Sequence, residues 1–114
     1  MIAGAKAVDT VGHVVMFGLG GIMVEVMKDV VFDFAPLSQA GARRMIASIR
    51  SFPLVEGFRG REGVSTDKLA EILQRMSQMV ADIPQIREIN LNPIIGYKEP
   101  SKTVAVDVRM KVTA

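Results

Sequence analysis

Residues 86–112, IREINLNPIIGYKEPSKTVAVDVRMKV, contain the clearest structural pattern in the chain. Two segments rich in β-branched residues, about 86–96 and 103–112, flank a polar turn at 98–102. The second segment alternates apolar and polar residues with a period of two, which is typical of a strand with one buried face. The pattern predicts a hairpin of two antiparallel β-strands.

The turn sets which residues of the two strands lie opposite one another. A turn centred between Glu99 and Pro100 predicts three polar pairs across the strands. These pairs are Glu88 with Lys111, Asn90 with Arg109, and Asn92 with Asp107. Because side chains alternate along a strand, all six share one face, and the opposite face is apolar. The apolar face carries Ile89, Leu91, Val106, Val108 and Met110. We therefore expect one side of the hairpin to join the core and the other to present oxygens and charges.

Asn92 and Asp107 end this polar row and are its best candidates for metal binding. An amide carbonyl and a carboxylate are hard oxygen ligands, and Mg²⁺ takes few of them from the protein while water and phosphate supply the rest. Pro93 removes a backbone donor beside Asn92 and stiffens the strand. The alternative is an ordinary solvated face of a hairpin, in which these side chains have no ligand. A β-bulge would shift the register and separate the pair.

Shorter strands are expected nearer the amino terminus. Residues 14–17 predict a short buried strand, which the glycine-rich string at 18–21 interrupts. Residues 22–27 and 30–34 predict two more strands, and the polar pair Lys28-Asp29 between them is consistent with a hairpin turn.

Two amphipathic helices follow these strands. Ser38 is a candidate N-cap for a helix over roughly 39–51, whose apolar residues recur at helical spacing. This apolar stripe consists of Ala42, Met45, Ile46 and Ile49. Residues 52–65 are punctuated by proline and glycine and are expected to form a loop. A second helix is predicted from about Thr66 to Ala81, again with one apolar face.

The order of strands, helix, loop, helix and hairpin predicts an α+β fold with a largely antiparallel sheet and two main helices. The 114 residues are enough for one domain, so residues 1–114 are expected to form a single domain. The chain contains no internal repeat and no linker-like tract.

Composition argues against several classes of protein. The net charge is +2 and the chain has one Tyr and no Trp, so nucleic-acid binding is not expected. It has no Cys, which excludes disulfides and thiolate chemistry. The sequence carries no apolar run long enough for a membrane span and no signal peptide, so we expect no membrane partner and a cytoplasmic location. The apolar content of 49% is high for a small monomer and predicts an interface with another chain or domain.

Four segments together resemble a known family. They are FGLGGIMVEVMKDVVFDFAPLS (17–38), FPLVEGFRG (52–60), EINLNP (88–93) and AVDVRM (105–110). In their order and spacing they are similar to the ATP-grasp region of the ADP-forming acyl-CoA synthetases, also known as acetate–CoA ligases, of the succinyl-CoA synthetase-like superfamily. The resemblance implies the carboxy-terminal half of an ATP-grasp fold. It also implies an acid–thiol ligase that interconverts acyl-CoA, ADP and phosphate with free acid, CoA and ATP.

The resemblance places functional residues on this sequence. The family's two Mg²⁺ ligands, which hold the phosphates of ATP or ADP, fall on Asn92 and Asp107. Its acid after the double glycine falls on Glu25, for which a strand-face charge is the alternative. Arg59 of the GFRG loop could meet phosphate or another subunit, or could be a surface residue. Gly18 and its glycine neighbours could admit phosphate or form a turn.

Two departures from the family pattern bear on activity. Asn90 stands where the family commonly carries an acid that helps hold the phosphohistidine loop of the partner, and an amide cannot take a proton as a carboxylate does. The resemblance also implies an earlier half of the ATP-grasp domain, with a phosphate-binding Lys, which would precede Met1. The chain's sole histidine, His13, is expected to be structural, and no residue is assigned a catalytic role.

Two functions follow from this resemblance. In the first, the chain is a fragment of an NDP-forming acyl-CoA synthetase that supplies the Mg–nucleotide phosphate wall and is inactive alone. Its partners would be the missing amino-terminal half and a CoA-binding or phosphohistidine domain or subunit. In the second, the chain is a non-catalytic interaction or regulatory module, as in acyltransferase fusions, and forms a homodimer through an exposed apolar edge. The sequence does not distinguish ATP from GTP or identify the acyl group.

Overall fold

The computed structural model describes residues 1–8, 12–19 and 29–113. The elements run in the order β1 (Ile2–Val8), β2 (Gly12–Gly18), β3 (Val30–Phe34), α2 (Gln39–Ser48), α3 (Phe52–Glu56), β4 (Gly57–Phe58), β5 (Arg61–Glu62), α4 (Thr66–Asp82), β6 (Ile86–Leu91), β7 (Ile94–Ile95), a 3₁₀ turn (Pro100–Lys102), β8 (Val104–Ala105) and β9 (Val108–Val112). The strand expected over 22–27 and the turn residue Lys28 lie outside the described residues.

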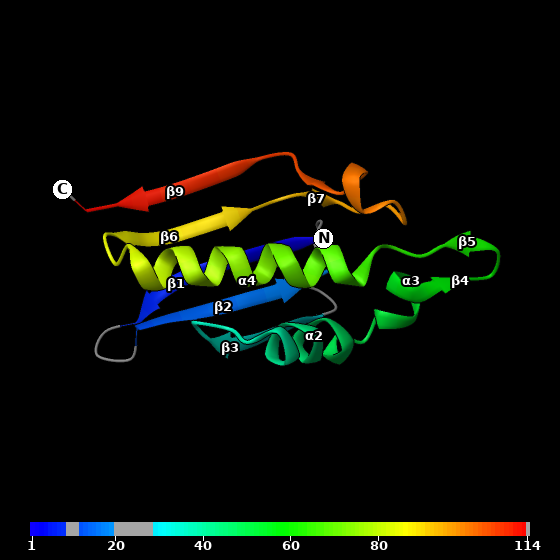
Figure 1. The fold of residues 1–114 in the computed structure, drawn as a ribbon, viewed down its shortest axis with the longest axis horizontal. Helices are drawn as coiled ribbons and strands as arrows, with labels where there is room; N and C mark the ends of the chain where they lie inside the picture. Colours follow the sequence, from blue (N-terminus) through cyan, green and yellow to red (C-terminus); the bar gives the residue numbers. More distant parts are fainter. Residues whose placement is uncertain (9–11, 20–28, 114) are drawn as a thin grey trace.

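A five-stranded sheet in the order β3-β2-β1-β6-β9 forms the body of the protein (Figure 1). Every neighbouring pair in it is antiparallel. The predicted α+β class with a largely antiparallel sheet is therefore confirmed. Strand β1 lies at the centre, between β2 and β6. Because β6 follows both helices in the sequence, the sheet is assembled from segments far apart in the chain.

The central strand β1 is one that the sequence patterns did not predict. Its residues are IAGAKAV, which are mostly small and lack the β-branched character of ordinary strands. Ala3 and Ala5 are buried, and α4 packs against this strand. Because its side chains are small, α4 can approach the sheet closely at β1. This close packing suits β1 to a central position in the sheet.

The two main helices cover one face of the sheet. α2 packs on β2 and β3, α4 packs on β1 and β2, and the helices pack on each other. Each begins with a serine N-cap, of which Ser38 was predicted and Ser65 was not. The Ser38 hydroxyl accepts a hydrogen bond from Gly41 N at 2.9 Å, and the Ser65 hydroxyl accepts one from Lys68 N at 3.1 Å. α2 ends at Ser48, three residues earlier than predicted.

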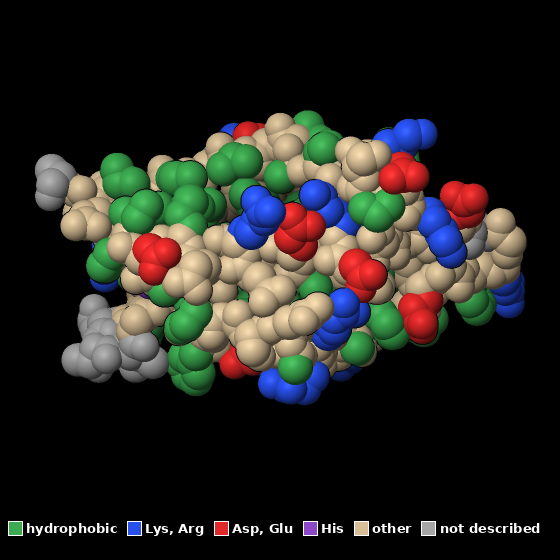
Figure 2. All heavy atoms as spheres, viewed as in Figure 1, with side chains coloured by type: hydrophobic (Ala, Val, Ile, Leu, Met, Phe, Trp, Pro, Cys, Tyr) green, Lys and Arg blue, Asp and Glu red, His purple; other side chains and the backbone are tan. Residues whose placement is uncertain are grey.

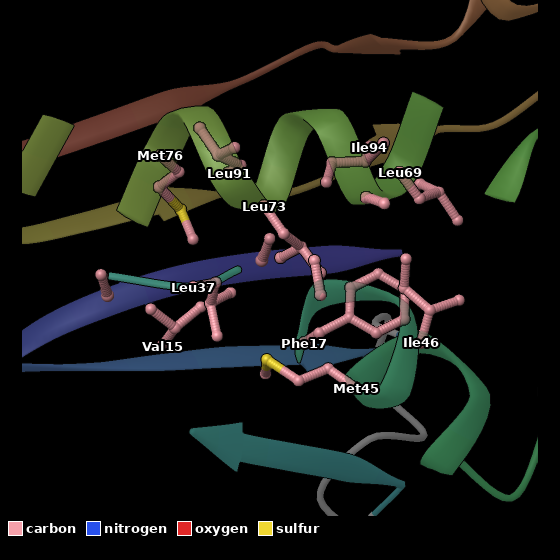
Figure 3. Packing of buried hydrophobic residues seen from close by; sticks show 14 of the residues in the cluster. Val15, Phe17, Leu37, Met45, Ile46, Leu69, Leu73, Met76, Leu91 and Ile94 are labelled. Atoms are coloured by element: carbon pink, nitrogen blue, oxygen red, sulfur yellow. The ribbon is translucent and has the colours of Figure 1, made fainter. Parts of the chain in front are cut away.

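The core lies between these helices and the sheet (Figure 3). The sticks show Phe17 and Val15 of β2 pointing toward residues of both helices, among them Ile46 and Leu73. Every residue of the stripe predicted for the first helix is buried. The helical periodicity therefore identified the core face correctly.

Two predictions about local structure are wrong. Residues 52–65, expected to be a loop, contain the short helix α3 and the β4–β5 hairpin. Pro53 lies in the first turn of α3, where a missing backbone N–H costs nothing, so the proline starts a helix here and does not break one. The two long strands of the carboxy-terminal hairpin are each divided in two, because the regular ladder stops at Leu91 and resumes at Ile94.

The apolar side of β9 is not covered by the helices. Val106, Val108, Met110 and Val112 are all exposed, although the hairpin pattern predicted that the first three join the core. Hydrophobic side chains gather at the upper left of Figure 2, where Figure 1 places β9. We call these four residues the β9 apolar strip. Among the described residues, no helix has the length and apolar character needed to cross a membrane.

Candidate functional site

The carboxy-terminal hairpin has the predicted register. Asn90 pairs with Arg109 and Leu91 with Val108. Beyond the ladder, Asn92 N donates a hydrogen bond to Asp107 O at 3.0 Å, so these two residues lie opposite each other as predicted. Past Pro93 the same register continues into the pairing of β7 with β8. The register shift within the β6–β9 ladder lies between residues 86 and 88, away from the candidate site. At the candidate site the ladder itself is interrupted, and the hydrogen bond between Asn92 and Asp107 bridges the break.

The polar residues of this hairpin lie on the face of the sheet opposite the helices. Lys111 Nζ is 3.6 Å from Glu88 Oε2, which places the two side chains on the same face. Glu88 and Asn90 line a hollow of about 410 Å³ on that face. We call this surface the open face.

The open face has a polar side and an apolar side. The polar residues come from β6 and β9, and Lys6 of β1 pairs with Glu88 across the strands. The apolar side of the hollow is lined by Val8, Val14, Met16 and Phe32. Phe32 is largely exposed, so an aromatic ring is available to a ligand that lies in the hollow.

Gly4 separates the two sides of the hollow. It pairs with Asn90, and a Cβ built on it would lie 3.6 Å from Asn90 Oδ1 and 3.0 Å from Ile89 O. The missing side chain therefore leaves space beside the Asn90 amide in the middle of the open face. Sequence reasoning missed Gly4 and Lys6 because it did not predict β1. The alternation of small residues along 3–7 was the available signal.

Asn92 and Asp107 fit a Mg²⁺ site in donor chemistry and in accessibility. Both side chains are exposed, and in the described part of the chain neither makes a hydrogen bond or an ion pair with its polar atoms. Their oxygens are therefore free to bind a cation. Among the described residues no group of three or more His, Asp or Glu side chains could enclose a metal. Two hard oxygens suit Mg²⁺ that keeps water and phosphate ligands, and they do not suit a cation that needs a full protein cage.

The other predicted site residues are not gathered with this pair. Glu25 lies outside the described residues. Arg59 lies at the turn of the β4–β5 hairpin, which Figure 1 shows beyond the end of the five-stranded sheet. Its φ is 52°, and its guanidinium lies 5.2 Å from the ring centre of Phe58. This arrangement is a two-residue turn with a cation over an aromatic ring, apart from the open face.

Asp29 is a buried acid, although the sequence pattern predicted it in a short polar turn. It accepts hydrogen bonds from Arg50 N at 2.6 Å and Ser51 N at 3.0 Å, and from the Ser51 hydroxyl. Burial raises the pKa of the Asp29 carboxyl, but these hydrogen bonds and the Arg50 charge outweigh it and hold the pKa below its ordinary value. A Cβ on Gly18 would lie 2.8 Å from Asp29 O, so this glycine serves a close approach within the fold.

His13 is buried in β2, as expected of a structural residue. Its Nε2 donates a hydrogen bond to Ile86 O at 2.6 Å, which ties β2 to the start of β6. By the strand register, this end of the sheet is opposite to the end that carries Asn92 and Asp107.

Comparisons with known proteins agree with this architecture. A family model described as an ATP-grasp domain matches residues 1–112. The beta subunit of acetate–CoA ligase (ADP-forming) I from Pyrococcus furiosus is 42% identical over 99 residues, which are 87% of this chain and 42% of that protein. The 4-hydroxybutyrate–CoA ligase (ADP-forming) from Nitrosopumilus maritimus is 41% identical over 110 residues, which are 96% of this chain and 16% of that protein.

A solved structure shares the fold closely. It is the dinucleotide-forming acetyl-coenzyme A synthetase 1 from Ca. Korarchaeum cryptofilum in complex with coenzyme A and Mg-AMPPCP, with its phosphohistidine segment pointing towards the nucleotide binding site. The TM-score is 0.91 at 37% identity, over 98% of this chain and 52% of that chain. The chain thus spans about half of this relative's length, and less of the curated relatives' lengths.

Proposed function

Because the chain belongs to the ATP-grasp domain family, we propose that it supplies the Mg²⁺–nucleotide phosphate-binding wall of an ADP-forming acyl-CoA synthetase. The observation that carries the proposal is the juxtaposition of Asn92 and Asp107, two exposed oxygen donors held opposite each other beside the hollow of the open face. Two similar proteins, from Pyrococcus furiosus and Nitrosopumilus maritimus, support the proposal because both are named as ADP-forming CoA ligases.

In this proposal Asp107 and Asn92 bind Mg²⁺ through their side-chain oxygens. Held there, the ion would supply positive charge against the nucleotide phosphates and so favour phosphoryl transfer to or from an acceptor. The backbone hydrogen bond between the two residues fixes them opposite each other, which supports a joint role in holding the ion.

The two sides of the hollow favour one orientation of the bound nucleotide. A base and sugar fit the apolar side, where Phe32 and Met16 are available for stacking and dispersion contacts. The phosphates then extend over Gly4 toward the polar residues of β6 and β9. Binding a purine nucleotide in this way uses both sides of the open face, and it accounts for an apolar surface next to a polar one.

The wall is one part of a complete site. We propose that a complementary ATP-grasp half closes over the open face, and that a CoA-binding or phosphohistidine domain or subunit carries out the acyl and CoA steps. Asn90 would contact the approaching phosphohistidine segment through hydrogen bonds alone, because it lacks the charge of an acid. The proposal includes a cytoplasmic location, as expected for an enzyme that draws on ATP and CoA.

A titration of the full chain with Mg-AMPPCP, followed by ¹⁵N NMR, tests the proposal. The side-chain amide of Asn92 should shift, and Mn²⁺ in place of Mg²⁺ should broaden the signals of Asn92 and Asp107 selectively. Asp107→Asn should weaken Mg-AMPPCP binding about tenfold or more, as expected for loss of a metal ligand. Asp82→Asn removes the same charge from the exposed end of α4 and should leave binding unchanged. Binding of Mg-AMPPCP with no response at Asn92, or no binding at all, would contradict the proposed wall.

A second candidate function is an interaction module that does not bind nucleotide. The β9 apolar strip favours it, because three exposed apolar side chains on an edge strand of the described sheet, with Val106 just before that strand, suit pairing with a second copy of the chain. Sedimentation equilibrium distinguishes the two functions when it is combined with the titration. A dimer that does not bind Mg-AMPPCP supports the interaction module, whereas a monomer that binds it supports the nucleotide wall.

A further inference from the structure

Three rows of side chains lie across the open face, two of them on β1, β6 and β9 and the third just beyond the ends of β6 and β9. Lys6, Glu88 and Lys111 form one row, and Gly4, Asn90 and Arg109 form the next. The third row holds Asn92 and Asp107. The middle row is therefore adjacent to the proposed Mg²⁺ ligands, and it is the row in which a glycine leaves space.

Arg109 is the cation of the middle row. It lies two residues after Asp107 along the chain, about 6.6 Å away at the rise of a strand. Within β9 it shares a face with Lys111, whose contact with Glu88 identifies that face as the open one. Arg109 is exposed, and in the parts of the chain that the structure describes it takes part in no ion pair and no side-chain hydrogen bond.

The neighbouring cations are placed differently. Lys111 already contacts Glu88 at 3.6 Å. Lys6 lies opposite the same acid and one row further from Asp107. Arg109 alone among these three has a neutral partner, Asn90, directly across the strands. Its charge is therefore available to an anion that lies between Asn90 and Asp107.

A nucleotide polyphosphate supplies such an anion. One carboxylate and one divalent cation leave the polyphosphate with excess negative charge. A planar guanidinium can bind two phosphate oxygens at once, a geometry that an ammonium cannot reproduce. Phosphates that extend from the third row over Gly4 would meet Arg109 on one flank, because Gly4 presents no side chain that would block them.

We propose that Arg109 binds phosphate oxygens of the Mg²⁺-bound nucleotide and makes the site selective for a nucleoside polyphosphate over a monophosphate. This inference rests on the proposed function, since it requires that Asn92 and Asp107 hold the metal. Arg109 contributes the part of the binding affinity that depends on the β- and γ-phosphates. The apolar side of the hollow contributes affinity for the base and sugar, which a nucleoside monophosphate shares.

The test compares Mg-AMPPCP and AMP binding to four forms of the full chain by ¹⁵N NMR titration. The forms are wild type, Arg109→Ala, Arg109→Lys and Arg87→Ala. Arg109→Ala should weaken Mg-AMPPCP binding about 10- to 100-fold, as expected for loss of a charge-assisted hydrogen-bonded pair, and leave AMP binding unchanged. Arg109→Lys should recover part of the loss.

Arg87→Ala is the matched control. It removes the same charge from β6, where the guanidinium contacts Pro84 O at the far end of the strand, and it should bind both ligands as wild type does. If Arg109→Ala binds Mg-AMPPCP as wild type does while Asp107→Asn loses it, the inference on Arg109 fails and the proposed wall stands. An equal loss of AMP and Mg-AMPPCP would assign Arg109 a structural role and overturn the inference. If wild type binds no Mg-AMPPCP, the proposed function and the inference fail together.

Discussion

Strands β6 and β9 are neighbours with the same alternation of apolar and polar residues, but only one of them has its apolar side covered. Ile89 of β6 is 3% exposed, whereas Met110, its direct partner in β9, is 48% exposed. On the other face the two strands together carry the polar residues of the candidate site. Alternation therefore predicts which side chains share a face, while the helices decide whether that face becomes core.

The largest expected effect comes from truncating each member of this pair. Ile89→Ala should lower the free energy of unfolding by about 2–5 kcal/mol, because it leaves a cavity in the core. Met110→Ala should lower it by less than about 1 kcal/mol, because the side chain is already half in solvent. Urea unfolding followed by circular dichroism measures both. Equal losses would show that β9 is as well covered as β6, and the comparison would not hold.

Two aspartates extend the comparison to polar residues. Asp29→Asn should lower the free energy of unfolding by about 1.5–3 kcal/mol, since a buried carboxylate that accepts three hydrogen bonds becomes a neutral amide. Asp107→Asn should change it by less than about 0.5 kcal/mol, because that side chain is exposed. The same unfolding measurement separates them, and a stability loss at Asp107 as large as that at Asp29 would argue for a structural role of Asp107.

The contribution of Asp29 should depend on pH. Its pKa is lowered in the folded protein, so the unfolded chain binds the proton more readily as the pH falls. The stabilisation is then complete above about pH 5 and is lost as the pH falls below the ordinary Asp pKa of about 3.9 through the lowered value. The stability difference between wild type and Asp29→Asn, measured from pH 7 to pH 3, should shrink at the acid end. A constant difference over this range would contradict the prediction.

The smallest effect on stability is expected from the β9 apolar strip. Val108→Thr with Met110→Gln should change the free energy of unfolding of the monomer by less than about 0.5 kcal/mol, because both side chains are exposed and shape is largely kept. If the strip pairs with a second copy, the same double variant should abolish the dimer in sedimentation equilibrium. Glu71→Gln with Arg75→Gln, on the exposed side of α4, is the control and should leave assembly unchanged.

Local patterns predicted much of the fold. The N-cap at Ser38, the apolar stripe of α2 and the extent of α4 follow from capping chemistry and helical spacing. The pairing of Asn92 with Asp107 follows from strand alternation about a turn. These predictions succeeded because each depends on residues close in the chain or joined by one turn.

The patterns failed where distant contacts decide the structure. Strand β1 carries alanine and glycine at its centre, and their burial depends on helices that follow many residues later. Asp29 has the character of a turn residue, but the Arg50–Ser51 segment folds over it and supplies its donors. The loop prediction for 52–65 treated Pro53 as a breaker, whereas its position at the start of α3 made it a helix former.

The candidate site shows the same division. Strand alternation about a turn was enough to predict that Asn92 and Asp107 lie opposite each other, because a period-two backbone allows few other pairings. The position of Gly4 in the neighbouring row, opposite Asn90, and the lack of a described helix over the open face depend on contacts between distant segments. Register could be predicted because it is a local property of two hydrogen-bonded strands. The cover of a face depends on how helices from elsewhere in the chain bury their own apolar surface.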